Sequence, residues 1–236
     1  MTGRPGLPEG PYVVVDADVC RAAGRTPQDV ARAAAHARVG VVQVRAKDAG
    51  ARDVVAMTLA VADALRGSRT LLVVDDRADV AAAARARGAV VDGVHVGRRD
   101  LHPDDVRSIL GPAALIGLSA ARPEHLRDVP ASVDYIGSGP VRLTPTKPDA
   151  TDAIGVDGVA AAVLATELPV VAIGGLSVAD VPDLRAAGAH GIAVVSEVCA
   201  APDPVQAAAA LVVAWRAASG RREPVLGTGR SLGARA

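Results

Sequence analysis

Short runs of β-branched and aliphatic residues recur along the chain and are separated by alanine-rich stretches. Several of these runs are continuously apolar rather than alternating, which is typical of parallel strands covered on both faces. They predict eight strands, over residues 12–16, 39–45, 71–76, 93–96, 114–118, 133–137, 170–174 and 191–196.

The alanine-rich stretches carry signals for the starts and ends of helices. Thr26 and Pro27 precede QDVARAAAHAR, which is an N-cap residue followed by proline at the first helical position. Ser177 precedes VADVPDLRAAG, and the closing Gly188 is a typical helix stop. The chain therefore alternates between strand and helix.

Eight strand–helix units over residues 11–219 predict a single-domain (β/α)8 TIM barrel in the α/β class. The rival is an open doubly wound sheet, but no G-x-G-x-x-G follows the first strand, which weakens its dinucleotide-binding version. Residues 1–10 and 220–236 are rich in Gly, Arg and Pro without periodicity. We expect them to be short disordered tails.

Composition narrows the possible partners. The 236 residues include 26 basic and 26 acidic side chains, and the three aromatic residues include no Phe. A nucleic-acid-binding protein would show a basic excess or aromatic stacking platforms, so nucleic acid is not expected as a partner. No apolar run reaches the roughly 18 residues of a membrane span, and no signal peptide is visible, so we expect a cytoplasmic protein without membrane contact. Cys20 and Cys199 lack metal-site spacing and are expected to be reduced, packed thiols.

The second predicted strand ends in three alternating polar residues, Gln43, Arg45 and Lys47. At strand spacing they project from one face, and two cations on the inner face of a barrel are costly unless an anion binds there. The alternative is a strand end that emerges into solvent with its cations extended into water.

Two further strand ends carry carboxylates. Asp75 and Asp76 end the third strand, and Asp100 follows the fourth. Mg²⁺ commonly takes one or two carboxylates together with water and substrate phosphate oxygens, so Asp76 and Asp100 are candidate ligands. The alternative is that these residues only cap the following helices.

The segments after the last three strands are suited to phosphate. The loop GSGPVRLTPTKPDAT is long and contains hydroxyls and one Lys, and Gly-Gly follows the seventh strand. In barrels of this kind, loops after strands seven and eight are the usual phosphate site. The candidate contacts are Thr144, Thr146, Lys147, Gly175, Val195 and Ser196.

Taken together, the segments VVQVRAK, HVGRRD and GPVRLTPTK, in this order, resemble the thiamine-phosphate synthase family over roughly residues 11–215. The resemblance implies a (β/α)8 barrel that joins a hydroxymethylpyrimidine diphosphate to a thiazole phosphate. The products are thiamine phosphate and pyrophosphate. It also implies Mg²⁺ on the diphosphate, a dissociative route through a stabilised pyrimidine methyl cation, and a homodimer.

The resemblance also implies roles for individual residues. Gln43, Arg45 and Lys47 would hold the pyrimidine diphosphate, with the two cations facing its phosphates. Asp76 and Asp100 would hold Mg²⁺. Ser119 and Lys147 would contact the pyrophosphate. The thiazole phosphate would be surrounded by Thr144, Thr146, Gly175, Val195 and Ser196.

Four positions depart from the family pattern. Asp75, at the diphosphate site, stands where Asn is usual, and Arg98 stands where Gln is usual. Ala121 replaces a frequent His, and Arg142 a frequent aromatic residue. At about 4 Å and an effective dielectric constant of about 20, an added charge is worth about 4 kcal/mol. Our hypothesis is that Arg98 compensates Asp75; the alternatives are that Asp75 joins the metal ligands or that diphosphate binding has drifted.

Two other functions remain open at this point. One is a thiazole-tautomerase-like or other phosphate-binding barrel enzyme without synthase activity. The other is a non-catalytic sensor of a phosphate ligand. The retained Asp76, Asp100, Arg45 and Lys47 favour the synthase. His95, in the strand GVHV, either contacts ligand or is a hydrogen-bonded histidine near the barrel mouth.

Overall fold

In the computed structural model, which describes residues 6–121, 123–144 and 152–219, eight parallel strands close into a barrel. Each strand pairs with the next along the chain, and β8 returns to pair with β1. The predicted (β/α)8 barrel is therefore confirmed. The strands are β1 (Gly10–Asp16), β2 (Val41–Arg45), β3 (Leu71–Asp75), β4 (Gly93–Val96), β5 (Leu115–Ser119), β6 (Tyr135–Ser138), β7 (Val170–Ile173) and β8 (Gly191–Val194).

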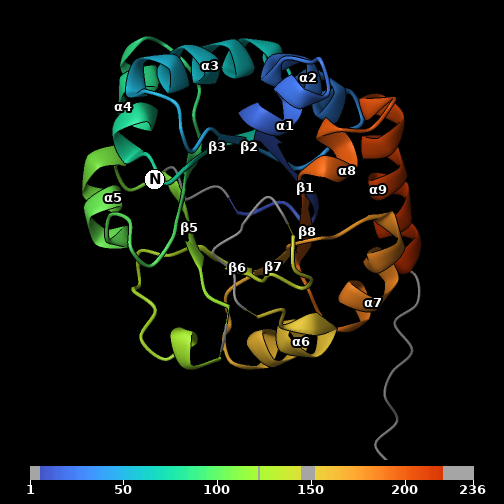
Figure 1. Cartoon of the computed structure of the whole chain (residues 1–236). Helices are drawn as coiled ribbons and strands as arrows, with labels where there is room; N and C mark the ends of the chain where they lie inside the picture. Colours follow the sequence, from blue (N-terminus) through green and yellow to red (C-terminus); the bar gives the residue numbers. More distant parts are fainter. Residues whose placement is uncertain (1–5, 122, 145–151, 220–236) are drawn as a thin grey trace, which may run out of the picture.

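Helices surround this ring of strands (Figure 1). In the described connection after β5, a short 3₁₀ turn takes the place of a regular α-helix. The helices are α1 (Ala17–Ala22), α2 (Pro27–His36), α3 (Ala51–Ala64), α4 (Ala78–Ala86), α5 (Pro103–Leu110), α6 (Gly155–Leu164), α7 (Val181–Ala186), α8 (Ser196–Cys199) and α9 (Pro204–Ser219), with 3₁₀ turns η1 (Pro123–Leu126) and η2 (Val178–Asp180).

The predicted helix starts are confirmed. Thr26 caps α2 by accepting a hydrogen bond from the Asp29 N–H, and Pro27 is the first helical residue. Ser177 and Asp180 form a reciprocal capping box at the start of η2. These local interactions need only neighbouring residues, which is why the sequence pattern identifies them.

The strands separate two apolar cores. Residues facing outward pack against the helices in one large cluster, which includes Cys20, Cys199 and Trp215. Residues facing inward alternate with them and fill the lower part of the barrel. The inner cluster consists of Tyr12, Val14, Val41, Val73, Leu115, Tyr135, Val171 and Ala193. Polar side chains lie above this inner layer, toward the carboxyl ends of the strands.

The N-terminal boundary differs from the predicted tail. β1 begins at Gly10, and Leu7 packs against the inner core while its carbonyl is hydrogen-bonded to His190 Nε2 at 2.9 Å. The end of segment 1–10 thus belongs to the barrel, because it covers apolar side chains at the bottom of the strands. Residues 220–236 lie outside the described residues. In the described part of the chain, none of the helices has both the length and the apolar character needed to cross a membrane.

A largely buried ion pair joins α5 to the residue that precedes β6. Arg107 Nη2 lies 2.8 Å from Asp134 Oδ2, with the two side chains 14% and 12% exposed. The same carboxylate oxygen accepts a hydrogen bond from the Ile116 N–H at 2.8 Å. Removing the cation would leave a buried carboxylate without this partner.

We expect Arg107→Ala to lower the free energy of unfolding by about 3–5 kcal/mol, measured by urea denaturation. The matched control is Arg66→Ala, because Arg66 forms an exposed ion pair with Asp63. Its loss should cost less than about 1 kcal/mol. Equal effects of the two substitutions would contradict the structural role assigned to the buried pair.

Candidate active site at the carboxyl end of the barrel

Charged side chains gather where β1, β2 and β3 end. The strand register places Asp16 of β1 opposite Arg45 of β2. These two residues form an ion pair, and Arg45 Nε lies 3.5 Å from Asp75 Oδ2 at the end of β3. Lys47 forms an ion pair with Asp76, and its Nζ lies 3.8 Å from Asp75 Oδ2. The two predicted cations are therefore at the barrel mouth, each held between carboxylates.

Acidic groups outnumber basic groups in this cluster. Burial and the neighbouring Asp76 raise the pKa of Asp75 to about 7, in opposition to Lys47 and Arg45. Burial and Asp76 likewise raise the pKa of Asp100. The mouth cluster consists of Asp16, Asp75, Asp76 and Asp100 with Arg45 and Lys47, an excess of two negative charges when all are ionised. A divalent cation would neutralise this excess and hold the carboxylates in their charged form.

The carboxylates that suit a metal are Asp76 and Asp100. They lie close enough for a side-chain hydrogen bond, which contributes to the raised pKa of Asp100 after burial and charge repulsion. Neither caps a helix: the N-cap residues of α4 and α5 are Arg77 and His102. Among the described residues, no three His, Cys, Asp or Glu side chains are grouped to hold an ion by themselves. The pair therefore fits an ion that also takes water and substrate oxygens, as Mg²⁺ does.

The raised pKa of Asp75 predicts how stability depends on pH without metal. The pKa rises from 3.8 to about 7 on folding because of burial and Asp76. The folded state therefore binds the proton more tightly than the unfolded state does. This proton stabilises the folded state fully below about pH 4, and the stabilisation is lost as pH rises through about 7. The loss is at most about 4 kcal/mol.

We expect Asp75→Asn to remove this loss, so that in EDTA the variant is more stable than the parent at pH 8 and similar at pH 4. Urea denaturation between these pH values measures the difference. Asp63→Asn is the matched control, because Asp63 is exposed and paired only on the surface of α3. A parallel pH dependence in parent and Asp75→Asn would overturn this assignment.

Asp16 is a site residue that the sequence interpretation missed. Its Oδ1 accepts hydrogen bonds from the N–H groups of Asp18 and Val19, both at 3.1 Å, and its Oδ2 pairs with Arg45. It thus caps α1 and fixes the guanidinium at the same time. Its place directly after the apolar run YVVV was the available signal, equivalent to that of Asp75.

Below the charged groups, a chain of hydrogen bonds crosses the barrel interior. Gln43 Nε2 donates to the Tyr12 hydroxyl at 3.0 Å, and this hydroxyl lies 3.1 Å from that of Tyr135. The Tyr135 hydroxyl lies 3.2 Å from His95 Nδ1, and His95 Nε2 lies 2.9 Å from Ser119 Oγ. The predicted residues Gln43 and Ser119 are thus its two ends, whereas the two tyrosines were not predicted.

Two glycines make room for this chain. A Cβ atom at Gly117 would lie 2.2 Å from Tyr135 Cζ and 2.3 Å from His95 Nδ1. One at Gly137 would lie 2.8 Å from His95 Cε1. A larger residue at Gly117 would displace both rings, and one at Gly137 would displace the His95 ring.

The loops after β6 and β7 lie side by side. The Val141 and Arg142 N–H groups donate to the carbonyls of Ile173 and Gly174 at 2.9 and 3.0 Å. Gly175 has a φ of 63°, and a Cβ atom there would lie 2.9 Å from Arg142 Cβ. Glycine is therefore required for this close approach.

Three of the remaining predicted phosphate contacts lie among the described residues, and two lie outside them. Thr144 lies in the loop after β6, and Val195 and Ser196 follow β8, whose Ala193 pairs with Ile173 of β7. These residues and Gly175 therefore share the carboxyl end of neighbouring strands. Thr146 and Lys147 lie outside the described residues.

The departures from the family pattern have different explanations. Arg142 Nη2 lies 2.5 Å from Asp180 Oδ1, and its Nη1 donates to the Gly175 carbonyl at 3.2 Å, so it braces the loop after β7. Asp75 has Arg45 and Lys47 rather than Arg98 within ion-pair distance, which places the compensating charge at the end of β2 and just after it. Nothing in the structure explains Ala121.

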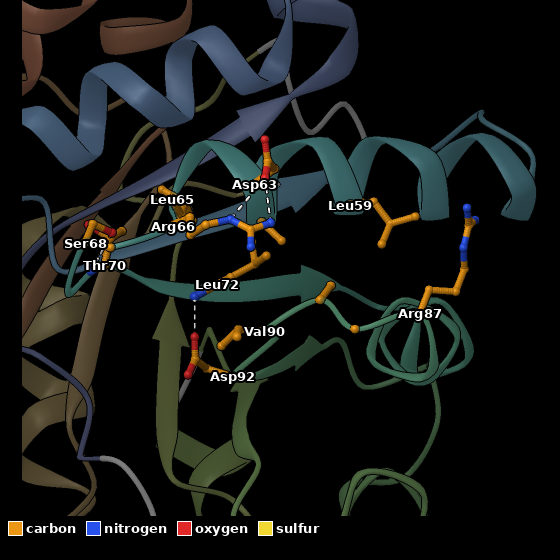
Figure 2. A pocket seen from close by; sticks show the side chains of 14 residues that line it. Leu59, Asp63, Leu65, Arg66, Ser68, Thr70, Leu72, Arg87, Val90 and Asp92 are labelled. Carbon is orange, nitrogen blue, oxygen red and sulfur yellow. Dashed lines mark hydrogen bonds and ion pairs between the residues drawn. The ribbon is translucent and has the colours of Figure 1, made fainter.

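A separate cavity of about 270 Å³ lies outside the barrel (Figure 2). It is lined by the end of α3, by residues 66–72 that lead into β3, and by residues 87–92 between α4 and β4. Its lining includes the exposed Asp63–Arg66 ion pair and Asp92, which accepts a hydrogen bond from the Leu72 N–H. None of the predicted site residues lines it. It lies near the start of β3, at the end of the barrel that serves stability rather than catalysis.

The fold and the mouth define an enzyme class: a (β/α)8 barrel with cations, carboxylates and glycine-rich loops at the carboxyl ends of its strands. The sequence profile of the thiamine monophosphate synthase family matches residues 11–198. The chain therefore belongs to this family, and it is a transferase of thiamine biosynthesis.

Individual proteins of this family are similar to the chain over most of its length. A thiamine-phosphate synthase of Xanthobacter autotrophicus is 45% identical over 179 residues, covering 75% of this chain and 82% of the relative. One of Corynebacterium efficiens is 43% identical over 190 residues, covering 79% and 88%. The solved thiamine phosphate pyrophosphorylase of Pyrococcus furiosus superposes with a TM-score of 0.77 at 29% identity, covering 89% of this chain and 96% of that one.

Proposed function

We propose that this chain condenses a hydroxymethylpyrimidine diphosphate with a thiazole phosphate, giving thiamine phosphate and pyrophosphate, and that Mg²⁺ is required. The C–O bond between the pyrimidine methylene and the diphosphate breaks, and its electron pair leaves with pyrophosphate. The thiazole nitrogen then bonds to the methylene carbon, and the positive charge remains on the thiazolium ring. The displacement is dissociative, so negative charge builds up on the leaving pyrophosphate as the C–O bond breaks, and groups that stabilise this charge lower the barrier.

The observation that carries this proposal is the mouth cluster. Arg45 and Lys47 stand at the end of β2, and Gln43 on the same face lies deeper and is buried. A ligand seated there would place its charged end beside the cations and its uncharged ring toward the interior. Cations held by Asp16, Asp75 and Asp76 are already oriented before the leaving group develops charge, which favours the transition state over the bound substrate.

Asp76 and Asp100 would hold Mg²⁺ together with diphosphate oxygens. When bound, the ion supplies positive charge that stabilises the leaving pyrophosphate. Ser119, at the end of β5, would donate a hydrogen bond to the same leaving group. Lys147 is proposed to contact it as well, by the resemblance of the GPVRLTPTK segment.

The thiazole phosphate would bind across the adjoining ends of β6, β7 and β8. The proposed contacts are Thr144, Thr146, Gly175, Val195 and Ser196. Gly175 and the paired loops allow the backbone to approach a phosphate closely. The two substrates would thus meet above the inner core, from opposite sides of the mouth.

The decisive experiment combines both substrates with purified protein, with and without Mg²⁺, and measures thiamine phosphate and pyrophosphate. We expect equal amounts of both products only with Mg²⁺. Binding of both substrates without turnover would favour a phosphate-ligand sensor. Conversion of the thiazole substrate alone would favour a tautomerase-like enzyme. The expected cytoplasmic location and homodimer remain predictions.

A further inference from the structure

The two ends of the interior hydrogen-bond chain are substrate contacts in the proposed function, but its three middle members have no assigned role. They come from three different strands: Tyr12 from β1, Tyr135 from β6 and His95 from β4. Both tyrosines are buried, at 4% and 1% exposure, in a protein whose aromatic residues number three. Tyrosine is an unusual choice for an inner core that phenylalanine would fill without a polar atom, so the hydroxyls need a reason.

The direction of the hydrogen bonds follows from proton counting. Gln43 donates to Tyr12, so the Tyr12 proton goes to its other neighbour, Tyr135. Tyr135 then has its own proton for His95 Nδ1. An Nδ1 that accepts leaves the neutral imidazole proton on Nε2, which donates to Ser119 Oγ. Every donor in the chain points the same way.

This direction matters at the mouth. Ser119 receives a hydrogen bond from His95, so its own hydroxyl proton is left for an acceptor oxygen beyond the chain. At the other end, one Gln43 proton is committed to Tyr12, which fixes the amide plane and its remaining donor and acceptor. A chain of four hydrogen bonds thus sets the orientation of both end groups before substrate arrives.

We propose that Tyr12, Tyr135 and His95 are positioning residues that act through Gln43 and Ser119, delivering a one-way sequence of donors that ends on an oxygen of the diphosphate substrate. Gly117 and Gly137 are part of this arrangement, because a Cβ atom at either position would clash with the His95 ring. The inference rests on the proposed function only for the identity of the final acceptor.

The first test is spectroscopic and needs no substrate. ¹⁵N-labelled histidine NMR of the folded protein, with His95 assigned by the missing signals of His95→Gln, reports which ring nitrogen carries the proton. We expect a neutral ring with the proton on Nε2, and a change in that pattern in Tyr135→Phe. A proton on Nδ1, or no change in Tyr135→Phe, would overturn the proposal.

The second test uses kinetics. Tyr135→Phe should lower kcat by about tenfold to hundredfold while the KM for the diphosphate substrate changes by less than about threefold. His95→Gln should retain more activity than His95→Asn, because its longer side chain reaches the position of Nε2 and can still donate to Ser119. Ser138→Ala is the matched control: Ser138 is a buried hydroxyl on the same strand as Tyr135, without a hydrogen-bond partner in the described structure.

A double-variant cycle completes the design. If Tyr135 acts through Ser119, Tyr135→Phe should cause little further loss in a Ser119→Ala background. Additive losses, or a Tyr135→Phe enzyme as active as Ser138→Ala, would overturn the positioning role. An inactive parent protein would refute the proposed function, and the histidine spectrum would still decide the direction of the chain.

Discussion

Replacing Arg45 by Met should lower kcat for thiamine phosphate formation by about 10²–10³-fold, which is the loss found on removing one preorganised group that stabilises transition-state charge. Arg45 is the more buried of the two mouth cations, and its guanidinium lies between Asp16 and Asp75. Burial weakens screening by water, so its charge acts strongly on a nearby diphosphate. Steady-state kinetics with both substrates and saturating Mg²⁺ measure the effect.

The same substitution removes the ion-pair partner of Asp16 and leaves Asp75 with Lys47 alone, so folding must be examined separately. Arg45→Lys keeps the charge but loses the planar fork that contacts two carboxylates at once, and we expect it to recover only part of the activity. Arg66→Met is the matched control, since Arg66 is exposed on the outside of the barrel. Full activity of folded Arg45→Met would contradict the role of the mouth cluster.

Replacing Asp76 by Asn should have the second large effect. The substitution keeps the shape and a carbonyl oxygen but removes the charge that attracts the ion. We expect at least about a hundredfold loss of pyrophosphate release at a fixed low Mg²⁺ concentration, with partial recovery at high Mg²⁺. Asp100→Asn should behave in the same way, because its carbonyl can still accept the hydrogen bond from the Gly97 N–H and keep the turn.

Titration of Mg²⁺ in the activity assay separates the possible causes. A raised Mg²⁺ requirement in both variants identifies the pair as the ligands, and calorimetry with Mg²⁺ and pyrophosphate checks binding directly. Asp104→Asn is the control, as Asp104 is an exposed carboxylate at the start of α5. An unchanged Mg²⁺ requirement in Asp76→Asn and Asp100→Asn would show that the ion, if needed, binds elsewhere.

The sequence alone was sufficient to predict the fold and to identify many of the side chains at the barrel mouth. A strand with both faces covered is continuously apolar. The residues at its end must be polar if they contact a polar ligand. The segments YVVVD, VVQVR and LLVVDD therefore each show where a strand ends. The alternation of side chains then places Gln43 and Arg45 on one face without any knowledge of neighbours. Such signals are local, which is why they survive in a single sequence.

Only the tertiary structure decided which side chains meet across the barrel. Tyr12 and Tyr135 are 123 positions apart, and their contact depends on barrel closure and strand register. For the same reason the partner of Asp75 proved to be Arg45 and Lys47 rather than Arg98, which is nearer to the expected metal ligand Asp100 in sequence. A sequence specifies the face on which a side chain lies, but pairing across a closed sheet depends on how all eight strands are staggered.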